Sequence, residues 1–132
     1  MRTLVLQTER KTELVDVTAE VRQAVHGQAG RVAVVFVPHT TAGVVLQATG
    51  EGATQVAVDV EAALQRLVDE GWSWKHVEEG DRNPWAHVRS ALTASSDTIP
   101  LEDRALALGD RQTIFFCEFD GPRERTVHVT VV

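Results

Sequence analysis

The residues with the clearest potential for chemistry lie near the end of the chain, where an apolar run leads into two carboxylates. Glu118 and Asp120 follow the run TIFFC, and Gly121, Pro122 and Arg123 come next. A carboxylate at the end of a buried strand is costly to desolvate unless a cation, a metal ion or hydrogen-bond donors meet it. The Gly-Pro pair predicts a sharp turn that lets Arg123 fold back toward Asp120. This spacing fits a functional site and a structural Asp–Arg clasp equally well.

A second polar group follows the strongest strand pattern in the chain. The run VAVVFV at residues 32–37 is rich in β-branched residues, and a proline ends it. The sequence HTTAG comes next, so His39, Thr40 and Thr41 lie at a strand end, followed by the flexible Gly43. Short loops on a rigid scaffold commonly carry binding groups. We therefore expect the imidazole of His39 and the hydroxyls of Thr40 and Thr41 to be binding groups, although threonine is also common in ordinary strands and turns.

A third polar group accompanies a predicted helix start. Asn83 is a favourable N-cap residue, and Pro84 is favoured at the first helical position. His87 and Ser90 are three residues apart and share one face of this helix. An imidazole beside free backbone N–H groups can bind an anion or a metal ion, although His87 taken alone also fits a partly buried structural histidine. His76 lies upstream in the segment WSWKH, whose alternation predicts extended backbone.

A strand-rich scaffold must hold these groups. The run RQTIFFCEF is apolar on both faces, which predicts a strand buried on two sides. The final segment alternates threonine and histidine with valine, which predicts a half-exposed strand and leaves His128 on its polar side. The order of elements predicts an α+β fold, with a mainly antiparallel sheet or sandwich and about three packed helices. Strands are expected at residues 2–7, 12–17, 31–37, 44–46, 99–101, 104–108, 111–119 and 125–132.

Three helices are expected between these strands. The first covers residues 19–26, with Thr18 as its N-cap and a glycine at its end. The longest covers residues 51–70, where valines and leucines recur at helical spacing. The third begins at Asn83, after a polar loop at residues 78–82.

Composition narrows the class of protein. The chain has 132 residues, which predicts one domain over residues 1–132, and a formal net charge of −6. This charge argues against a nucleic-acid binder that relies on a broad basic field. The single cysteine, Cys117, lies in an apolar run and indicates a core residue in a reducing cytoplasm. No signal-peptide pattern and no long apolar run are present, so we expect neither secretion nor a membrane partner.

The motifs in their order along the chain resemble the YjbQ-like family. The resemblance rests on HTTAG at residues 39–43, His76, NPWAHVRSAL at 83–92 and LALGDRQTIFFCEFDGPRER at 106–125. Each motif is weak alone, but together they are specific and cover essentially the whole chain. Members of this family were long uncharacterised and are now often assigned a secondary thiamine-phosphate synthase activity. That reaction joins a pyrimidine-methyl diphosphate to a thiazole phosphate and releases pyrophosphate.

The resemblance implies a compact α+β fold, a homotrimer with pockets at subunit boundaries, and a set of site residues. His39, His87, Glu118 and Asp120 are expected to be catalytic, and a divalent metal ion, Mg²⁺ or Zn²⁺, would be held by His39, His76 and His87. The diphosphate leaving group would need such a metal ion or Arg123 for charge stabilisation. The residues expected to bind the phosphorylated substrate are Thr40, Thr41, Asn83, Ser90, Gln112 and Arg123.

The chain departs from the family pattern at three places. Gln47 and Ala48 replace an Asn-Glu pair that typically follows the HTTAG motif, which removes one candidate metal ligand or general base. Arg111 replaces the tryptophan usual before Gln112. Asp59 matches a family aspartate across a rearranged loop, and on its own it would be a solvated helix residue.

Three functions are compatible with these observations. The first is an enzyme that acts on a phosphorylated small molecule at a histidine-rich site. The second is a non-catalytic trimer that binds a phosphorylated metabolite or an ion, which the replacement at Ala48 favours. The third is an interaction trimer whose polar cluster only joins the subunits.

Overall fold

The computed structural model describes residues 1–78 and 82–132, so the centre of the predicted polar loop, residues 79–81, lies outside the described residues. The elements in chain order are β1 (Arg2–Gln7), β2 (Glu13–Asp16), α1 (Thr18–Val25), β3 (Val32–Phe36), β4 (Ala42–Ala48), α2 (Val56–Leu67), α3 (Pro84–Leu92), β5 (Ser96–Glu102), β6 (Ala105–Leu106), β7 (Gln112–Glu118) and β8 (Glu124–Val131). Every strand pairing within this described part is antiparallel. The predicted α+β class, with three helices and mainly antiparallel sheets, is confirmed.

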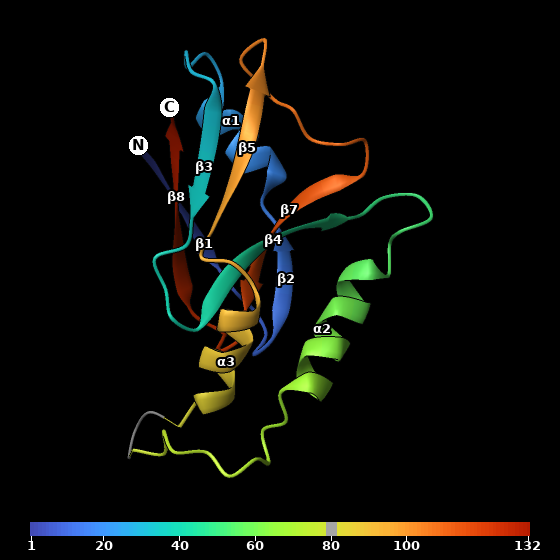
Figure 1. Cartoon of the computed structure of the whole chain (residues 1–132), viewed down its shortest axis with the longest axis vertical. Helices are drawn as coiled ribbons and strands as arrows, with labels where there is room; N and C mark the ends of the chain where they lie inside the picture. Colours follow the sequence, from blue (N-terminus) through green and yellow to red (C-terminus); the bar gives the residue numbers. More distant parts are fainter. Residues whose placement is uncertain (79–81) are drawn as a thin grey trace.

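The larger sheet has the strand order β1-β8-β3-β5-β6, and the smaller one has the order β2-β7-β4 (Figure 1). The closing strand β8 lies between β1 and β3 and alternates as predicted, because Val127 and Val129 are buried while Thr126 and His128 are half-buried. Strand β7 lies at the centre of the smaller sheet, and all its residues after Gln112 are buried. The prediction of a strand buried on both faces is therefore confirmed.

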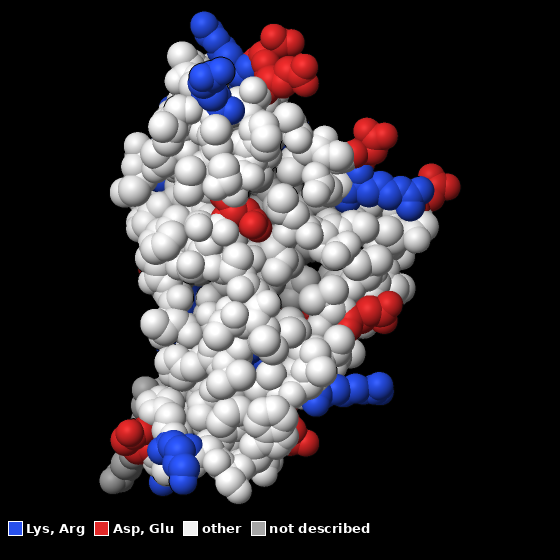
Figure 2. All heavy atoms as spheres, viewed as in Figure 1, with Lys and Arg blue, Asp and Glu red and all other residues white. Residues whose placement is uncertain are grey.

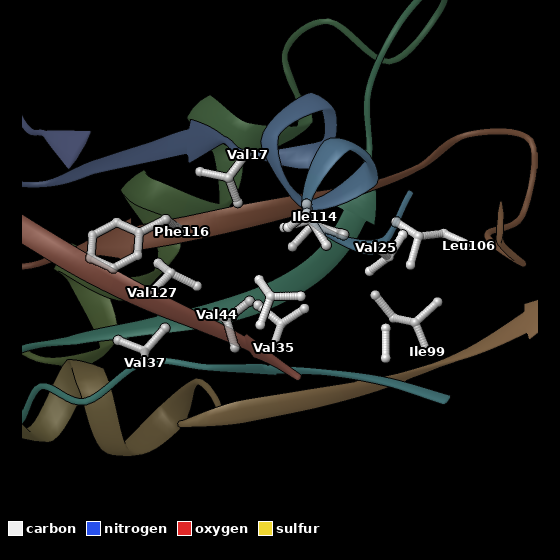
Figure 3. Packing of buried hydrophobic residues seen from close by; sticks show 14 of the residues in the cluster. Val17, Val25, Val35, Val37, Val44, Ile99, Leu106, Ile114, Phe116 and Val127 are labelled. Carbon is white, nitrogen blue, oxygen red and sulfur yellow. The ribbon is translucent and has the colours of Figure 1, made fainter. Parts of the chain in front are cut away.

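The hydrophobic core fills the space between the two sheets and beneath α1. Figure 3 shows Ile114 and Phe116 of β7 pointing toward Val35 and Val127 of the larger sheet, with residues around α1 above them. Cys117 is fully buried on the other face of β7, against a smaller apolar cluster. Burial raises the pKa of its thiol to about 12, with a smaller contribution from nearby carboxylates. A protonated, inaccessible thiol fits the interpretation of Cys117 as a core residue.

The predicted boundaries of two helices were wrong. Thr18 is the first residue of α1 rather than its N-cap, and its hydroxyl accepts a hydrogen bond from the Ile114 amide at 2.9 Å. Helix α2 begins at Val56 instead of Glu51, because Gly50 and Gly52 adopt positive φ angles and form a turn there. The apolar repeat predicted the helix itself, but the two glycines delay its start by five residues.

Gly43 has a role that differs from the predicted loop flexibility. It lies inside β4, and a Cβ atom at this position would lie 2.0 Å from the Thr93 hydroxyl and 2.9 Å from the Ala94 carbonyl oxygen. The backbone of β4 also pairs with Ala94 through Val44. Glycine is needed here because the chain after α3 passes close to the strand.

Strand β5 is longer than the predicted edge segment. It pairs with β3 over five registered residue pairs and carries only the two-residue β6 on its other side. Pro100, which cannot donate to a ladder, lies just before the two residues that pair with β6. No helix of the described part is long and apolar enough to cross a membrane.

We expect Ile114→Ala to lower the free energy of unfolding by about 3 kcal/mol, because it leaves a cavity where a fully buried side chain packs. The matched control is Leu92→Ala at the end of α3, where the residue is 57% exposed and the change should be within about 0.5 kcal/mol. Urea unfolding of both variants tests this. Equal destabilisation at the two positions would contradict the assignment of the core.

Candidate functional site

Glu118 is a fully buried carboxylate that is surrounded by hydrogen-bond donors. Arg125 meets it with two nitrogens: Nε donates to Oε2 at 2.8 Å and Nη2 donates to Oε1. The amides of Phe119 and Asp120 donate to Oε1 at 3.0 and 2.9 Å, and the Thr8 hydroxyl lies 2.9 Å from Oε2. The chain itself therefore supplies the cation and the donors that this buried carboxylate was expected to require. These donors occupy the hydrogen-bonding positions of both carboxylate oxygens.

Two opposing effects act on the pKa of Glu118. Burial alone would raise it, but the hydrogen bonds from Arg125 and from the Asp120 amide, with the positive charge of Arg125, together outweigh burial and lower the pKa. The carboxylate is therefore ionised at neutral pH, and it forms a buried ion pair with Arg125.

Arg125 is the residue that sequence reasoning missed. It is 3% exposed, and besides Glu118 it donates from Nη2 to the Thr41 hydroxyl at 2.9 Å. The signal was present in the alternation of β8, because Arg125 has the same parity as Val127 and Val129, which point into the core. An arginine on the buried side of a strand requires a carboxylate partner, and Glu118 was the available one.

Asp120 and Arg123 form the clasp that their spacing predicted. Arg123 donates from Nη2 to the Asp120 carboxylate at 2.6 Å and from Nε to the Asp120 carbonyl oxygen at 2.8 Å. The Asn83 side chain donates to the same carboxylate at 2.6 Å, which ties the start of α3 to this turn. Asn83 occupies the N-cap position, but its side chain makes no capping hydrogen bond, and its Oδ1 is buried without a hydrogen-bond partner among the described residues.

The turn after β7 requires glycine because the β1–β2 loop passes against it. A Cβ at Gly121 would lie 2.3 Å from the Arg10 carbonyl oxygen and 2.8 Å from the Thr8 hydroxyl. The backbone of this turn also bonds the loop directly, since the Gly121 amide donates to the Lys11 carbonyl oxygen at 3.1 Å. The DGPR turn and the β1–β2 loop are therefore fixed against each other.

A cleft of about 550 Å³ opens beside the two arginines. Four of the predicted site residues line it, namely His39, Thr40, Thr41 and Arg123, and they come from the HTTAG loop and the DGPR turn. Arg125 also lines the cleft, and the Arg123 side chain is half exposed. The remaining lining residues are Phe36, Val37, Pro38 and Ser95.

His39 is held in one orientation by the backbone of β8. Its Nε2 lies 3.0 Å from the Thr126 amide nitrogen and 3.1 Å from the Thr126 carbonyl oxygen. Burial lowers the pKa of His39, the nearby charge of Arg125 lowers it further, and the Thr126 backbone contact offsets this only in part. A neutral ring that accepts the amide hydrogen at Nε2 fits both observations and carries its own hydrogen on Nδ1.

A second hollow, of about 460 Å³, lies at the start of α3. His76 and His87 contact each other edge to face with ring centroids 5.1 Å apart, and Trp74 and Pro84 also line this hollow. The His76 Nδ1 lies 2.5 Å from the Glu78 carboxylate. The segment before His76, predicted to be extended, contains no strand, and Trp72 and Trp74 stack there with centroids 5.3 Å apart.

The structure does not bring the three predicted metal-binding histidines together within one chain. His39 lies in the first cleft, whereas His76 and His87 lie in the second hollow. Within residues 1–78 and 82–132, no three His, Cys, Asp or Glu side chains are placed to hold a metal ion. The residues of a single chain therefore do not fit the three-histidine ligand set.

Three predicted substrate-binding residues are absent from the cleft lining: Asn83, which contacts Asp120, and also Ser90 and Gln112. Ser90 donates its hydroxyl to the Ala42 carbonyl oxygen at 2.7 Å, which joins α3 to β4. Gln112 accepts the Gly109 amide at 2.8 Å in the turn before β7, and it pairs with Ala48 at the far end of β4. At about 3.3 Å per residue, Ala48 is roughly 20 Å from Ala42, the residue of β4 nearest the HTTAG loop. The Ala48 departure therefore does not touch the His39 cleft of its own chain.

Comparison with known proteins follows the same motifs. The sequence model of the UPF0047 protein YjbQ-like family matches residues 2–132. The chain belongs to the YjbQ-like UPF0047 family. It is 36% identical over 129 residues to the UPF0047 protein MJ1081 of Methanocaldococcus jannaschii, covering 96% of this chain and 90% of that one. It is 34% identical over 138 residues to the UPF0047 protein YugU of Bacillus subtilis, covering 100% and 98%.

The fold of this YjbQ-like chain agrees with that of a solved relative. The crystal structure of an uncharacterised YjbQ/UPF0047 protein from Clostridium acetobutylicum superposes with a TM-score of 0.91 at 36% identity, over 100% of both chains. The family and its α+β fold are thereby established for this chain.

Glu118→Gln should lower the free energy of unfolding at pH 7 by about 3–5 kcal/mol, because it leaves Arg125 buried without its counter-charge. The folded-state pKa of Glu118 lies below its unfolded value of about 4.3, so its contribution is complete above that pH and is lost as pH falls through the folded-state pKa. Urea unfolding of both proteins should therefore show their stabilities converging below about pH 4.

The exposed Glu51→Gln serves as the matched control and should change stability little at either pH. A difference between wild type and Glu118→Gln that stays the same from pH 7 down to acid would contradict the ionised pair.

Proposed function

We propose that the protein binds a phosphorylated small molecule in the His39 cleft and acts on it as a transferase of the thiamine-phosphate synthase type. The observation that carries this proposal is the convergence of His39, Thr40, Thr41 and Arg123 on one cleft. These side chains offer an imidazole, two hydroxyls and a guanidinium, which are donors that match phosphate oxygens.

Arg123 is the side chain best suited to hold a phosphate. It is half exposed, and the Asp120 clasp uses Nε and one Nη2 hydrogen. Because a guanidinium has five N–H groups, three remain for a ligand. Asp120 and Asn83 orient the guanidinium, so they act in this proposal as positioning residues. Glu118 has the same role toward Arg125, since its oxygens are already occupied by donors.

In the proposed reaction, the bond between the methylene carbon and the diphosphate oxygen breaks, and the thiazole nitrogen forms a new bond to that carbon. The leaving diphosphate takes the electron pair, so negative charge grows on its bridging oxygen. Arg123 and the Thr40 hydroxyl would stabilise this charge, and the Nδ1–H of a neutral His39 could donate to the same oxygen. The walls of Phe36 and Val37 supply apolar surface for the organic part of the substrate.

The other expected site residues remain predictions. His87 and His76 line the second hollow, where they could contact the ring portion of a substrate or bind a divalent metal ion with ligands from outside this chain. No step of the proposal passes through a metal ion, because the three histidines do not meet within the described residues. The activity assay described below therefore includes Mg²⁺ or Zn²⁺ as an added component. Ser90 and Gln112 support the backbone around α3 and β7.

A cytoplasmic location is also part of this proposal.

A non-catalytic binding protein is the alternative, and one observation favours it. Both carboxylates of the predicted catalytic set are paired with arginines, Glu118 with Arg125 and Asp120 with Arg123. Neither is free to act as a general base in this arrangement. Such a protein would bind the phosphorylated ligand in the same cleft without converting it.

We expect Arg123→Gln to lower kcat/KM for thiamine-phosphate formation by about 100-fold, because the leaving diphosphate loses a charged donor. The assay uses purified protein with Mg²⁺ or Zn²⁺ and the two phosphorylated substrates, with His39→Gln and His87→Ala measured alongside. The exposed Arg104→Gln, on the turn between β5 and β6, is the matched control and should keep full activity.

Product formation that is unaffected by Arg123→Gln and His39→Gln would contradict the placement of the site in this cleft. Ligand binding without product, lost in Arg123→Gln, would establish the binding protein instead of the enzyme.

The homotrimer implied by the family resemblance is part of the proposal, and α2 supports it. None of the twelve residues of α2, all of them described, is buried, although the helix carries eight apolar side chains. Val58 and Leu67 are 53% and 64% exposed. Figure 1 shows α2 standing beside the sheets, and the face in Figure 2 carries few charged side chains across its middle. An amphipathic helix left so exposed fits contact with another copy of the chain.

Val58→Glu should convert a three-chain species into monomers if α2 lies at the subunit contact, because a buried charge there is costly. Size-exclusion chromatography with light scattering measures the change. Ala19→Glu on the exposed side of α1 is the control and should leave the mass unchanged. A wild-type protein with the mass of a single chain would contradict the trimer directly.

A further inference from the structure

A third hollow, separate from both sites above, lies where the β1–β2 loop meets the end of α2 and the middle of α3. Its volume is about 620 Å³, and it shares no lining residue with the His39 cleft. Most of its walls are charged side chains. The charged ones are Arg10 and Lys11 of the loop, Arg66, Asp69 and Glu70 around the end of α2, and Arg89 of α3; Thr12 of the loop and Gln65 of α2 complete the lining.

Arg89 forms the buried part of this hollow and is incompletely paired. It is 2% exposed, and Nη2 donates to the Val68 carbonyl oxygen at 2.9 Å. Its Nη1 lies 3.9 Å from the Glu70 carboxylate, which is beyond hydrogen-bond distance. Its Nε is buried and has no hydrogen-bond partner among the described residues. Burial lowers the pKa of Arg89 and nearby acidic groups offset this only in part, yet a guanidinium keeps its proton at neutral pH.

Both carboxylates of the lining are already engaged. Glu70 accepts a hydrogen bond from the Lys11 ammonium at 2.7 Å, and Asp69 accepts the Gly71 amide at 2.7 Å. Lys11 is further fixed above the Trp85 ring, 4.6 Å from its centroid. Four cationic and two acidic side chains line the hollow, but Arg10 is already paired with Glu61 at 3.1 Å. Lys11, Arg66 and Arg89 still outnumber Asp69 and Glu70, so the hollow remains locally positive in a chain whose formal net charge is −6.

We propose that this hollow is a second anion site, which takes inorganic phosphate or the phosphate group of a small monoester. The unpaired Nε of Arg89 would donate to one oxygen of the anion, and the positive charge of the guanidinium would strengthen this hydrogen bond. Lys11 and Arg66 lie at the rim of the site. On binding they would contact the anion in place of solvent, and Lys11 would also give up its contact with Glu70. This inference does not depend on the proposed function, because the two sites have no residue in common.

Glu70 gives the site an internal competitor. Its carboxylate lies between Lys11 and Arg89 and holds Lys11 in the free protein. A phosphate dianion that enters must displace this single charge from the ammonium. Removal of the Glu70 charge should therefore strengthen anion binding, whereas removal of Arg89 should weaken it.

The test is titration of inorganic phosphate into the full chain, followed by calorimetry and by the ¹⁵N–¹H resonance of the Arg89 Nε. We expect this resonance to shift on binding, and we expect Arg89→Gln to weaken phosphate affinity by at least about tenfold. Lys11→Gln should weaken it by about threefold, and Glu70→Gln should strengthen it by a similar factor. Lys11→Gln and Glu70→Gln change exposed side chains, so they decide the question even if Arg89→Gln fails to fold.

Arg123→Gln is the control that separates this site from the His39 cleft, and it should leave the Arg89 resonance response intact. Loss of all phosphate binding in Arg123→Gln, with full binding retained in Arg89→Gln, would overturn the inference and leave the His39 cleft as the site. An Arg89 resonance that does not move at saturating phosphate would also overturn it.

Discussion

The ion pair between Glu118 and Arg125 is the interaction on which the rest of the structure depends. It lies at the point where β7 ends and β8 begins, so it joins the smaller sheet to the larger one. The Thr8 hydroxyl ties the β1–β2 loop to the same carboxylate, and the Thr41 hydroxyl ties the HTTAG loop to the same guanidinium. Three segments that are distant in sequence, the β7–β8 connection, the β1–β2 loop and the HTTAG loop, therefore meet at one buried charge pair.

This arrangement explains why a functional cleft forms beside the pair. His39 is held by the Thr126 backbone, next in sequence to Arg125, and the DGPR turn before β8 adds Arg123 to the lining of the same cleft. Asp120 then orients Arg123, with Asn83 as a second anchor. The exposed donors of the cleft thus rest on the buried Glu118–Arg125 pair, in which both carboxylate oxygens accept hydrogen bonds. Such support is what holds a polar site in one geometry.

Most of the fold could be predicted from strand patterns, because alternation and apolar runs indicate directly which side chains are buried. The two-sided run before Glu118 and the alternating run from Thr126 onward both take the places in the sheets that their patterns predict. The clasp of Asp120 and Arg123 was also readable, since both residues lie within one turn. Contacts between distant segments were harder to infer. Gly43 follows a threonine pair that resembles a loop, and only the approach of Thr93 shows why glycine is required.

The histidines show the limit of local patterns more sharply. His39, His76 and His87 each lie at a plausible position, yet nothing in their local sequence states which of them share a pocket. The structure groups His76 with His87 and places His39 elsewhere. The exposed α2 and the distant Ala48 end of β4 belong to surfaces that a single chain leaves open. Residues on those surfaces can complete a site only when another molecule covers them.

The central claim is that the buried pair positions the ligand cleft, and Arg125→Lys tests it most directly. Lysine keeps the charge opposite Glu118 but cannot make the two-pronged contact or reach Thr41 in the same way. Calorimetry with thiamine phosphate should show a folded variant whose affinity is at least about tenfold weaker than that of wild type. A folded Arg125→Lys protein with wild-type affinity would contradict the account, because the cleft would then not depend on the pair.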